Sequence, residues 1–290
     1  MAGRASGAQP HRRPVPLIGW VGAFLVLGFV VLGLIGPSVA PYGSKELAAP
    51  RQERPSDRHL LGTNKVGQDL LSQLIVGTRS SLLVAALAAA GAVTIATVVG
   101  LAAGLAGGWP DVILMRVADV TIALPRLPLL MLLGAVVGTS LIRVALVIAV
   151  VFWPGAARVL RSQVRSLRRR SHVVAARGFG AGPLRVARLH LLPEMSLVVV
   201  TVFLSAASRA VLLEAGLAFL GVGDPSRVSW GSIIRDARAS PGLFYTTFWT
   251  WWILPPVVAI VLVLLGLMFL GMGFETRVNP RLSRDGALHR

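Results

Sequence analysis

Four charged side chains fall within long apolar stretches of the sequence: Asp119, Arg126, Arg209 and Glu214. Charges in such surroundings are energetically expensive, so they usually mark either a buried ion pair or the lining of a polar path. In one continuous helix, Asp119 and Arg126 would share a face. Arg209 and Glu214 do not share a face squarely. We therefore expect these two either to pair with the earlier charges or a partner subunit, or to line a transport path in which Glu214 faces a polar cavity.

A strongly basic stretch runs from Arg158 to Arg188, with nine arginines and no acidic residue. It overlaps the sequence HVVAARGFGAGPLRVARLHLLP, residues 172–193, which we call the docking segment. Two features of this segment point to close contact with another surface: small residues that allow near approach to the backbone, and arginines beside an apolar stripe. The small residues are Ala175, Ala176, Gly180, Ala181 and Gly182; the stripe is Leu184, Ala187 and Leu191, flanked by Arg185 and Arg188.

Glycine and proline in the docking segment predict its local shape. Gly180 to Pro183 should end one short helix, and Pro183 suits the first turn of the next. Two short helices meeting at a turn would form a compact projection whose arginines contact acidic side chains or anionic headgroups. The plainer alternative is a basic loop with an incidental helix.

Several catalytic chemistries are excluded by the residues present. Lys45 and Lys65 are the only lysines, and neither completes a phosphate-binding GxxxxGK motif. Cysteine is absent, and the five histidines show no HExxH pattern or carboxylates at ligand spacing. We therefore expect no catalytic residue, metal or cofactor in this chain. An integral-membrane enzyme is disfavoured for the same reason.

The composition is that of a helical membrane protein. Hydrophobic residues make up 54% of the 290 residues and charged residues only 14%, whereas about 25% is usual in soluble domains. The net charge of +17 could suggest nucleic-acid binding, but the arginines cluster between apolar runs, as the positive-inside rule expects. We therefore predict a multi-pass protein in the lipid bilayer that does not bind nucleic acid.

Six apolar runs are long enough to predict membrane-spanning helices. They cover residues 17–36, 80–110, 111–138, 140–160, 193–221 and 250–273. The first is read as an uncleaved span, and Pro125 and Pro128 should kink the third. The basic stretch places its loop, and with it both termini, in the cytoplasm. In the external segment between the first two spans, the helical spacing of Val66, Leu70, Leu71 and Leu74 predicts a helix. This helix would be either an amphipathic helix in the membrane interface or a loop helix packed on the bundle.

The docking segment resembles the EAA signature of ABC importer permeases through Ala175-Ala176, Gly180 and Leu192-Pro193. Over about residues 60–280, the chain is similar to the second permease subunit of dipeptide and oligopeptide importers, a family that includes nickel permeases. The matching blocks are LLGTNKVGQDLLSQLIVG (60–77), GGWPDVILMRVADV (107–120), WPGAARVLRSQVRSLRRR (153–170), LLEAGLAFLGVG (212–223) and SWGSIIRDAR (229–238).

This resemblance implies an all-α type I importer transmembrane domain in a bacterial plasma membrane. It also implies a homologous permease, one or two ABC ATPase subunits that carry ATP and Mg, and an extracytoplasmic substrate-binding protein. The expected divisions are 1–77, a transmembrane domain at 78–273 with a coupling loop at 161–192, and a tail at 274–290. The residues expected to couple to the ATPase are Ala175, Ala176, Gly180, Pro183, Arg185, Arg188, Leu192 and Pro193.

The cargo expected from the resemblance is a di- or oligopeptide. A permease for nickel, glutathione or another small solute, or a stand-alone secondary transporter, remains as an alternative. The chain departs from the family at Val174, where a glutamate is usual, and this substitution leaves the docking segment itself without a carboxylate. Further departures are Asn64 for aspartate, and Gln68 and Gln73 for arginine.

Overall fold

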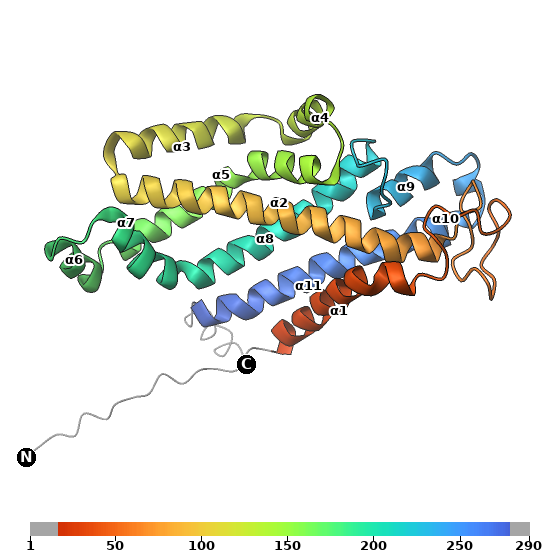
Figure 1. Cartoon of the computed structure of the whole chain (residues 1–290), viewed down its shortest axis with the longest axis horizontal. Coiled ribbons are helices and arrows are strands. Elements are labelled where there is room, and N and C mark those ends of the chain that lie inside the picture. Colours follow the sequence, from red (N-terminus) through yellow and green to blue (C-terminus); the bar gives the residue numbers. More distant parts are fainter. Residues whose placement is uncertain (1–16, 279–290) are drawn as a thin grey trace, which may run out of the picture.

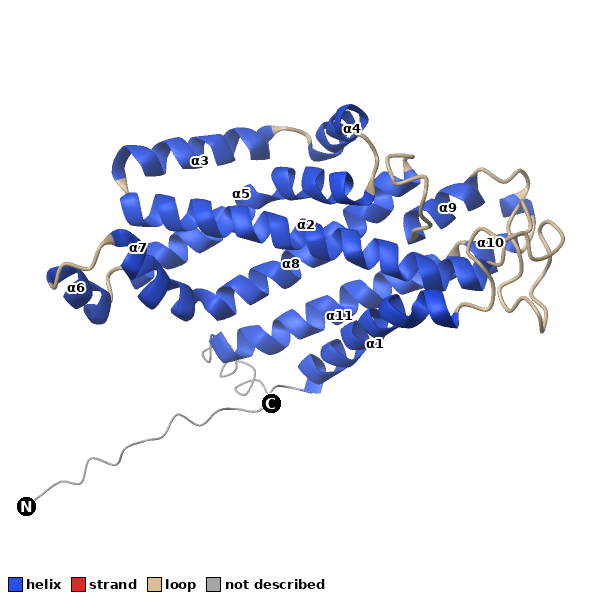
Figure 2. Cartoon of the chain, viewed as in Figure 1, coloured by secondary structure: helices blue, strands red, loops and turns tan. Residues whose placement is uncertain are grey.

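A computed structural model of the chain describes residues 17–278. Within this range the backbone is helical with connecting loops, and the β interaction it contains is an isolated bridge between Thr63 and Asp69 (Figure 2). The all-α class predicted from the sequence is confirmed. Residues 1–16 and 279–290 lie outside the described residues. The prediction that both termini are cytoplasmic concerns these two segments.

The long helices are α1 (Leu17–Val39), α2 (Leu70–Ala106), α5 (Leu141–Leu167), α8 (Leu192–Phe219) and α11 (Leu254–Val278). The shorter ones are α3 (Gly108–Ala123), α4 (Arg126–Val137), α6 (Ser171–Gly178), α7 (Pro183–Val186), α9 (Trp230–Arg238) and α10 (Phe248–Trp252). A π-helical turn, Ala187–Leu191, joins α7 to α8. In the described chain, five helical stretches are long and apolar enough to cross a membrane, or six if the bent pair α3–α4 counts as one span.

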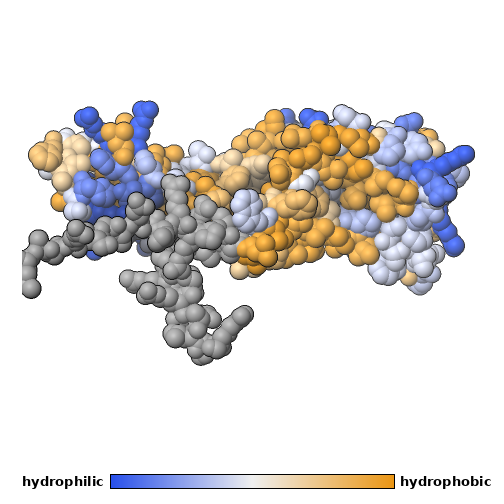
Figure 3. All heavy atoms as spheres, turned by 90° about the horizontal axis from the view of Figure 1, so that it is seen from below, coloured by the Kyte–Doolittle hydropathy of each residue, from blue (hydrophilic) through white to orange (hydrophobic). Residues whose placement is uncertain are grey.

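The helices form an elongated bundle with different structures at its two ends (Figure 1). α6 and α7 lie at one end, whereas the loop after α1, α9 and α10 lie at the other. On the face shown in Figure 3, an apolar band separates two more polar ends. This distribution is the one that a bilayer imposes on a spanning bundle, because polar groups avoid the hydrocarbon region.

The core of the bundle is built from small residues that allow close helix contact. α2 packs against α5 and α8, and α1 packs against α11. A Cβ added at Gly104 of α2 would lie 2.5 Å from Cγ1 of Val164 on α5. A Cβ added at Gly22 of α1 would lie 2.4 Å from the backbone N of Leu270 on α11. Such small-residue contacts are typical of helices packed in membranes, where apolar burial gives little driving force.

The predicted third span is divided into two helices. α3 ends at Ala123, α4 begins at Arg126, and the two axes are bent by 94°. Leu124 and Pro125 adopt extended conformations at the break. A residue before proline is disfavoured in the α region, which explains why the helix stops there. The prediction of one shared helical face for Asp119 and Arg126 is therefore wrong, because they lie on different helices.

The helix predicted from Val66, Leu70, Leu71 and Leu74 is formed only in part. Val66 lies in the loop, whereas the three leucines belong to the first turns of α2. The chain remains irregular until Asp69, and α2 begins at Leu70 rather than at Ser80. The Asp69 carboxylate caps α2 by accepting the Ser72 N–H at 2.7 Å, and its other oxygen lies 2.9 Å from Nδ1 of His59. This cap ends the loop and starts the helix at a fixed position.

Candidate functional site

The docking segment folds as a projection of two short helices, as predicted. α6 ends at Gly178, the chain turns through Gly180 at φ +85°, and Pro183 occupies the first turn of α7. A Cβ added at Gly178, Gly180 or Gly182 would meet no atom within 4 Å. At Gly180 the positive φ itself favours glycine. At Gly178 and Gly182 no contact within the described chain requires a small residue, so this surface is open to another molecule.

A buried apolar face anchors this projection to the bundle. Val173, Val186, Leu191 and Met195 are fully buried, and they share one cluster with Leu160, Val164 and Leu167 of α5. Of the apolar stripe predicted from Leu184, Ala187 and Leu191, the last two residues are buried, but the prediction for Leu184 is wrong. Leu184 is 81% exposed, and Val186 takes the inward position.

The tip of the projection carries exposed apolar side chains that sequence reasoning did not single out. Phe179 is 93% exposed and Leu184 is 81% exposed, on opposite sides of the Gly180–Gly182 turn. Val174 is also exposed. The signal in the sequence was a lone phenylalanine between two glycines. Large apolar side chains that are exposed beside arginines are candidates for contact with a partner.

The arginines of the basic stretch divide into two groups. One group is held by the bundle: Arg161 donates to both carboxylate oxygens of Asp111 on α3 at 2.5 Å, and Arg158 forms an ion pair with Asp119. Arg168 donates to the Gly104 carbonyl at the end of α2, at 2.8 Å. Among the described residues, the other group forms no ion pair and comprises Arg169, Arg177, Arg185 and Arg188. This second group is available to a partner.

One carboxylate does reach the base of the docking segment. Glu194, in the first turn of α8, accepts from Arg170 at 2.8 Å and lies 2.6 Å from Nε2 of His172. Val174 removes a carboxylate from the exposed surface, but Glu194 compensates part of the positive charge behind it. The region is consequently less uniformly basic than residues 158–188 alone suggest.

The four charges in apolar stretches do not pair with one another as expected. Asp119 pairs with Arg158 on α5. Arg126 lies over the Phe152 ring, with its guanidinium carbon 5.1 Å from the ring centroid. Arg209 forms no ion pair with any described residue. The expected pairing between the third and fifth spans is therefore not formed, because Asp119 is bound by Arg158 and Arg126 lies over Phe152.

Glu214 is buried between α8, α2 and the start of α9. Its side chain is 4% exposed and hydrogen-bonds to Ser81 and Ser229, while Oε2 has no partner among the described residues. It lines a small polar space together with Ser80 and Asp224. Glu214 is thus separated from both lipid and the larger cavity described next.

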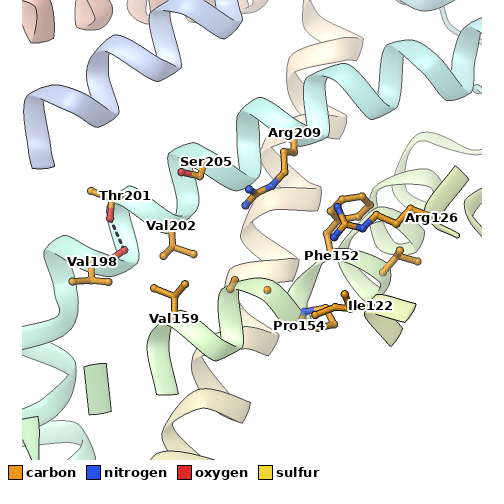
Figure 4. A pocket seen from close by; sticks show the side chains of 13 residues that line it. Ile122, Arg126, Phe152, Pro154, Val159, Val198, Thr201, Val202, Ser205 and Arg209 are labelled. Carbon is orange, nitrogen blue, oxygen red and sulfur yellow. Dashed lines mark hydrogen bonds between the residues drawn. The ribbon is translucent and has the colours of Figure 1, made fainter. Parts of the chain in front are cut away.

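Arg126 and Arg209 instead line one cavity of about 380 Å³ among α3, α4, α5 and α8. Figure 4 shows Arg209 on α8 and Arg126 beside Phe152 at this space. Thr201 and Ser205 add hydroxyl groups along α8, and Pro154 and Val159 belong to the α5 wall. Its walls contain no acidic residue. The cavity therefore combines two positive charges with hydroxyl groups on a largely apolar wall.

Asp224 fixes the far end of α5 to the loop after α8. Its carboxylate accepts the Leu141 N–H at 3.1 Å, and the Ser226 hydroxyl and N–H at 2.6 and 2.9 Å. Partial burial raises the pKa of this carboxyl, but these hydrogen bonds and the charge of Arg227 outweigh it, so the pKa lies below its ordinary value.

Comparisons with known proteins agree on one family. Residues 96–284 match the family described as binding-protein-dependent transport system inner membrane component. A putative peptide permease of Brucella suis biovar 1 is 36% identical over 228 residues, covering 78% of this chain and 74% of that protein. A di/tripeptide transport system permease of Pseudomonas aeruginosa is 34% identical over 271 residues, covering 90% and 87%. A glutathione transport system permease of Pectobacterium atrosepticum is 30% identical over 233 residues, covering 79% and 75%.

Proposed function

Because this chain belongs to the family of binding-protein-dependent transport system inner membrane components, we propose that it is the permease subunit of an ATP-driven importer of di- or oligopeptides. Relatives named as peptide, dipeptide and di/tripeptide permeases support this cargo. The nickel alternative has no comparable support among these relatives. A secondary transporter working alone does not fit a family defined by dependence on a binding protein.

The observation that carries the proposal is the open, charged surface of the docking segment. The chain has no GxxxxGK motif, so the ATP and Mg of the cycle reside on partner ATPase subunits. Phe179 and Leu184 project beside glycines that nothing in the described chain covers. Arg185 and Arg188 form no ion pair with any described residue and can contact acidic groups of an ATPase. Ala175, Ala176 and Gly180 permit close approach of a partner. Pro183 begins α7, and Leu192 and Pro193 begin α8.

Coupling then follows from a two-state equilibrium. ATP binding draws two ATPase subunits together, and each carries the docking segment of one permease with it. Since Val186 and Leu191 of this segment share an apolar cluster with residues of α5 and with Met195 of α8, its displacement moves the helices that line the cavity. The pair of permeases is thereby shifted between inward-open and outward-open states, and hydrolysis resets it.

This mechanism assigns the two ends of the bundle to opposite sides of a bacterial cytoplasmic membrane. The docking segment faces the cytoplasm, in agreement with its arginines. The loop after α1, α9 and α10 face outward, where an extracytoplasmic binding protein delivers cargo. A homologous permease completes the translocation path against the cavity face of α5 and α8.

The test is to place a bulky side chain on the docking surface without straining the backbone. Gly182 has φ −66°, and an added Cβ meets no atom, so Gly182→Trp should leave the fold intact but hinder docking. We expect ATP-dependent peptide uptake by the complete transporter to fall about tenfold or more, equivalent to about 1.4 kcal/mol of coupling free energy. The amount of the chain in the membrane should not change.

Two variants serve as controls for this test. Gly182→Ala should transport normally, and Gly180→Ala should report the effect of the positive φ alone. Normal peptide uptake by a Gly182→Trp transporter present at the parent level would contradict the proposed docking surface.

A further inference from the structure

The cavity between α5 and α8 contains two arginines that the described chain leaves without a counter-ion. Arg209 lies well inside α8, and Arg126 lies over Phe152, near the middle of α5. A charge at this depth in a bilayer is normally paired, or it faces water or a ligand. The acidic groups within the helices follow this rule, since Asp111, Asp119 and Glu214 all have protein partners.

The geometry of the cavity favours an anion. Both guanidinium groups belong to its lining and no acidic side chain does (Figure 4). Ser205 adds a hydroxyl donor, whereas the Thr201 hydroxyl donates to the Val198 carbonyl at 2.9 Å. α4 begins at Arg126, so the positive end of a twelve-residue helix lies at the same place. The remaining wall is apolar and includes Val151, Val159 and Val202. Low-polarity walls strengthen the field of charges inside a cleft.

From this arrangement we infer that Arg126 and Arg209 form a carboxylate-binding station in the translocation path, which receives the cargo from the outer side. Guanidinium groups bind carboxylates through paired, charge-assisted hydrogen bonds. The carboxylate is either the C-terminus of the peptide or an acidic side chain within it. The inference rests on the proposed function, because it places peptide cargo against this face of the permease.

The charge of the cavity can be measured without any peptide. The chain has no cysteine, so Ser205→Cys introduces a single thiol into the cavity wall. In the complete transporter, an anionic methanethiosulfonate reagent should modify this thiol about tenfold faster than a cationic one, which is the local enrichment expected in a cleft of one charge. The readout is the mass shift of this chain over time.

Neutralising the arginines should remove that bias. In Ser205→Cys carrying Arg126→Gln and Arg209→Gln, the two reagents should react at similar rates. Arg116→Gln is the matched control, because Arg116 lies on α3 outside the cavity lining, and it should preserve the bias. Equal rates in the parent, or a thiol that neither reagent reaches in any nucleotide state, would overturn the inference.

Transport of three peptides identifies the carboxylate. Trialanine, its C-terminal amide and an amidated Ala-Glu-Ala are first shown by calorimetry to bind the substrate-binding protein, and their ATP-dependent uptake is then compared in proteoliposomes. The double Gln variant should lose at least about tenfold more uptake of a carboxylate-bearing peptide than of trialanine amide. Loss for trialanine indicates the C-terminus, whereas loss for amidated Ala-Glu-Ala indicates the side chain. Replacing both arginines by lysine should restore part of the difference.

Failure of this inference is distinguishable from failure of the proposed function. Equal loss for all three peptides, with weaker assembly, would assign the arginines to the contact with the second permease and overturn the cargo station. An unchanged uptake of all three would overturn it as well. If the parent complex transports none of the peptides with ATP, the peptide-importer function fails, and the cargo role fails with it, while the thiol rates still decide whether the cavity concentrates anions.

Discussion

At the scale of single residues, some charged groups of this protein form ion pairs, whereas others face a cavity. Asp111 and Asp119 bind arginines of α5, and Glu194 binds Arg170 and His172. Arg126 and Arg209 share a cavity instead of an ion pair. Because unpaired charges inside a membrane are costly, these two residues are the ones for which a role in transport explains the arrangement best.

Asn64, Gln68 and Gln73 show how departures from the family pattern act together. Asn64 Nδ2 and Gln73 Nε2 each donate to Gln68 Oε1 at 2.8 Å. The loop before α2 is therefore held by an amide cluster at positions where the resemblance led us to expect charged side chains. The three substitutions are mutually consistent, because replacing one amide alone by a charge would leave it beside neutral groups.

Asp224 provides a prediction for stability at this scale. Its lowered pKa means that the ionised carboxylate stabilises the fold at pH values above the ordinary carboxyl pKa of about 4, and that this contribution disappears as the pH falls through the lowered native value. Asp224→Asn should therefore lower the melting temperature of the detergent-solubilised chain at pH 7. The difference from the parent should shrink near pH 3. An equal difference at both pH values would show that the charge of Asp224 is not what stabilises the start of α5.

At the scale of elements, the contact between α2 and α5 positions both functional regions. The N-terminal end of α5 is held by Asp224, its middle lines the cavity, and its last turns anchor the docking segment through Leu160, Val164 and Leu167. Within that segment, the π-helical turn Ala187–Leu191 joins α7 to α8. π-Helical turns recur at functional sites, and this one lies where we propose that movement of the docking segment enters the bundle.

Gly104 tests the tightness of this helix contact. A Cβ there would lie 2.5 Å from Val164 Cγ1 and 2.7 Å from Val164 Cβ. Gly104→Ala should lower the free energy of unfolding by about 1–3 kcal/mol through overpacking, measured by thermal unfolding in detergent. Gly28→Ala on α1 is the matched control, since nothing lies within 4 Å of the added Cβ, and it should be neutral or slightly stabilising. Equal melting temperatures for Gly104→Ala and the parent would mean that α2 and α5 pack less closely than described.

At the scale of the whole molecule, apolar runs and arginine distribution were sufficient to predict a helical membrane protein. The turn at Gly180 and Pro183 was also predictable, because it depends on local backbone preferences. Contacts between residues distant in the sequence could not be predicted. Arg158 and Asp119 are 39 positions apart, and Arg161 and Asp111 are 50 apart. Periodicity does not reveal such pairs. The bend after Ala123 was foreseen as a kink, but its 94° angle depends on packing as well as on proline.

The functional regions lie in a fixed order along the bundle. The docking segment occupies one end of the bundle, the arginine cavity lies within the apolar region, and the long loop with α9 and α10 occupies the other end. A transporter driven from one side and loaded from the other needs this order. Under the proposed function, the chain forms one half of the path, and other subunits supply the second half, the ATP hydrolysis and the delivery of cargo.

The most direct test of this account is peptide accumulation in proteoliposomes that contain this permease, its partner permease, the ATPase subunits and the binding protein. The account predicts uptake that requires ATP and every one of these subunits, and that stops when a catalytic residue of the ATPase is replaced. Peptide uptake by this chain alone, driven by a proton or sodium gradient without ATP, would contradict it.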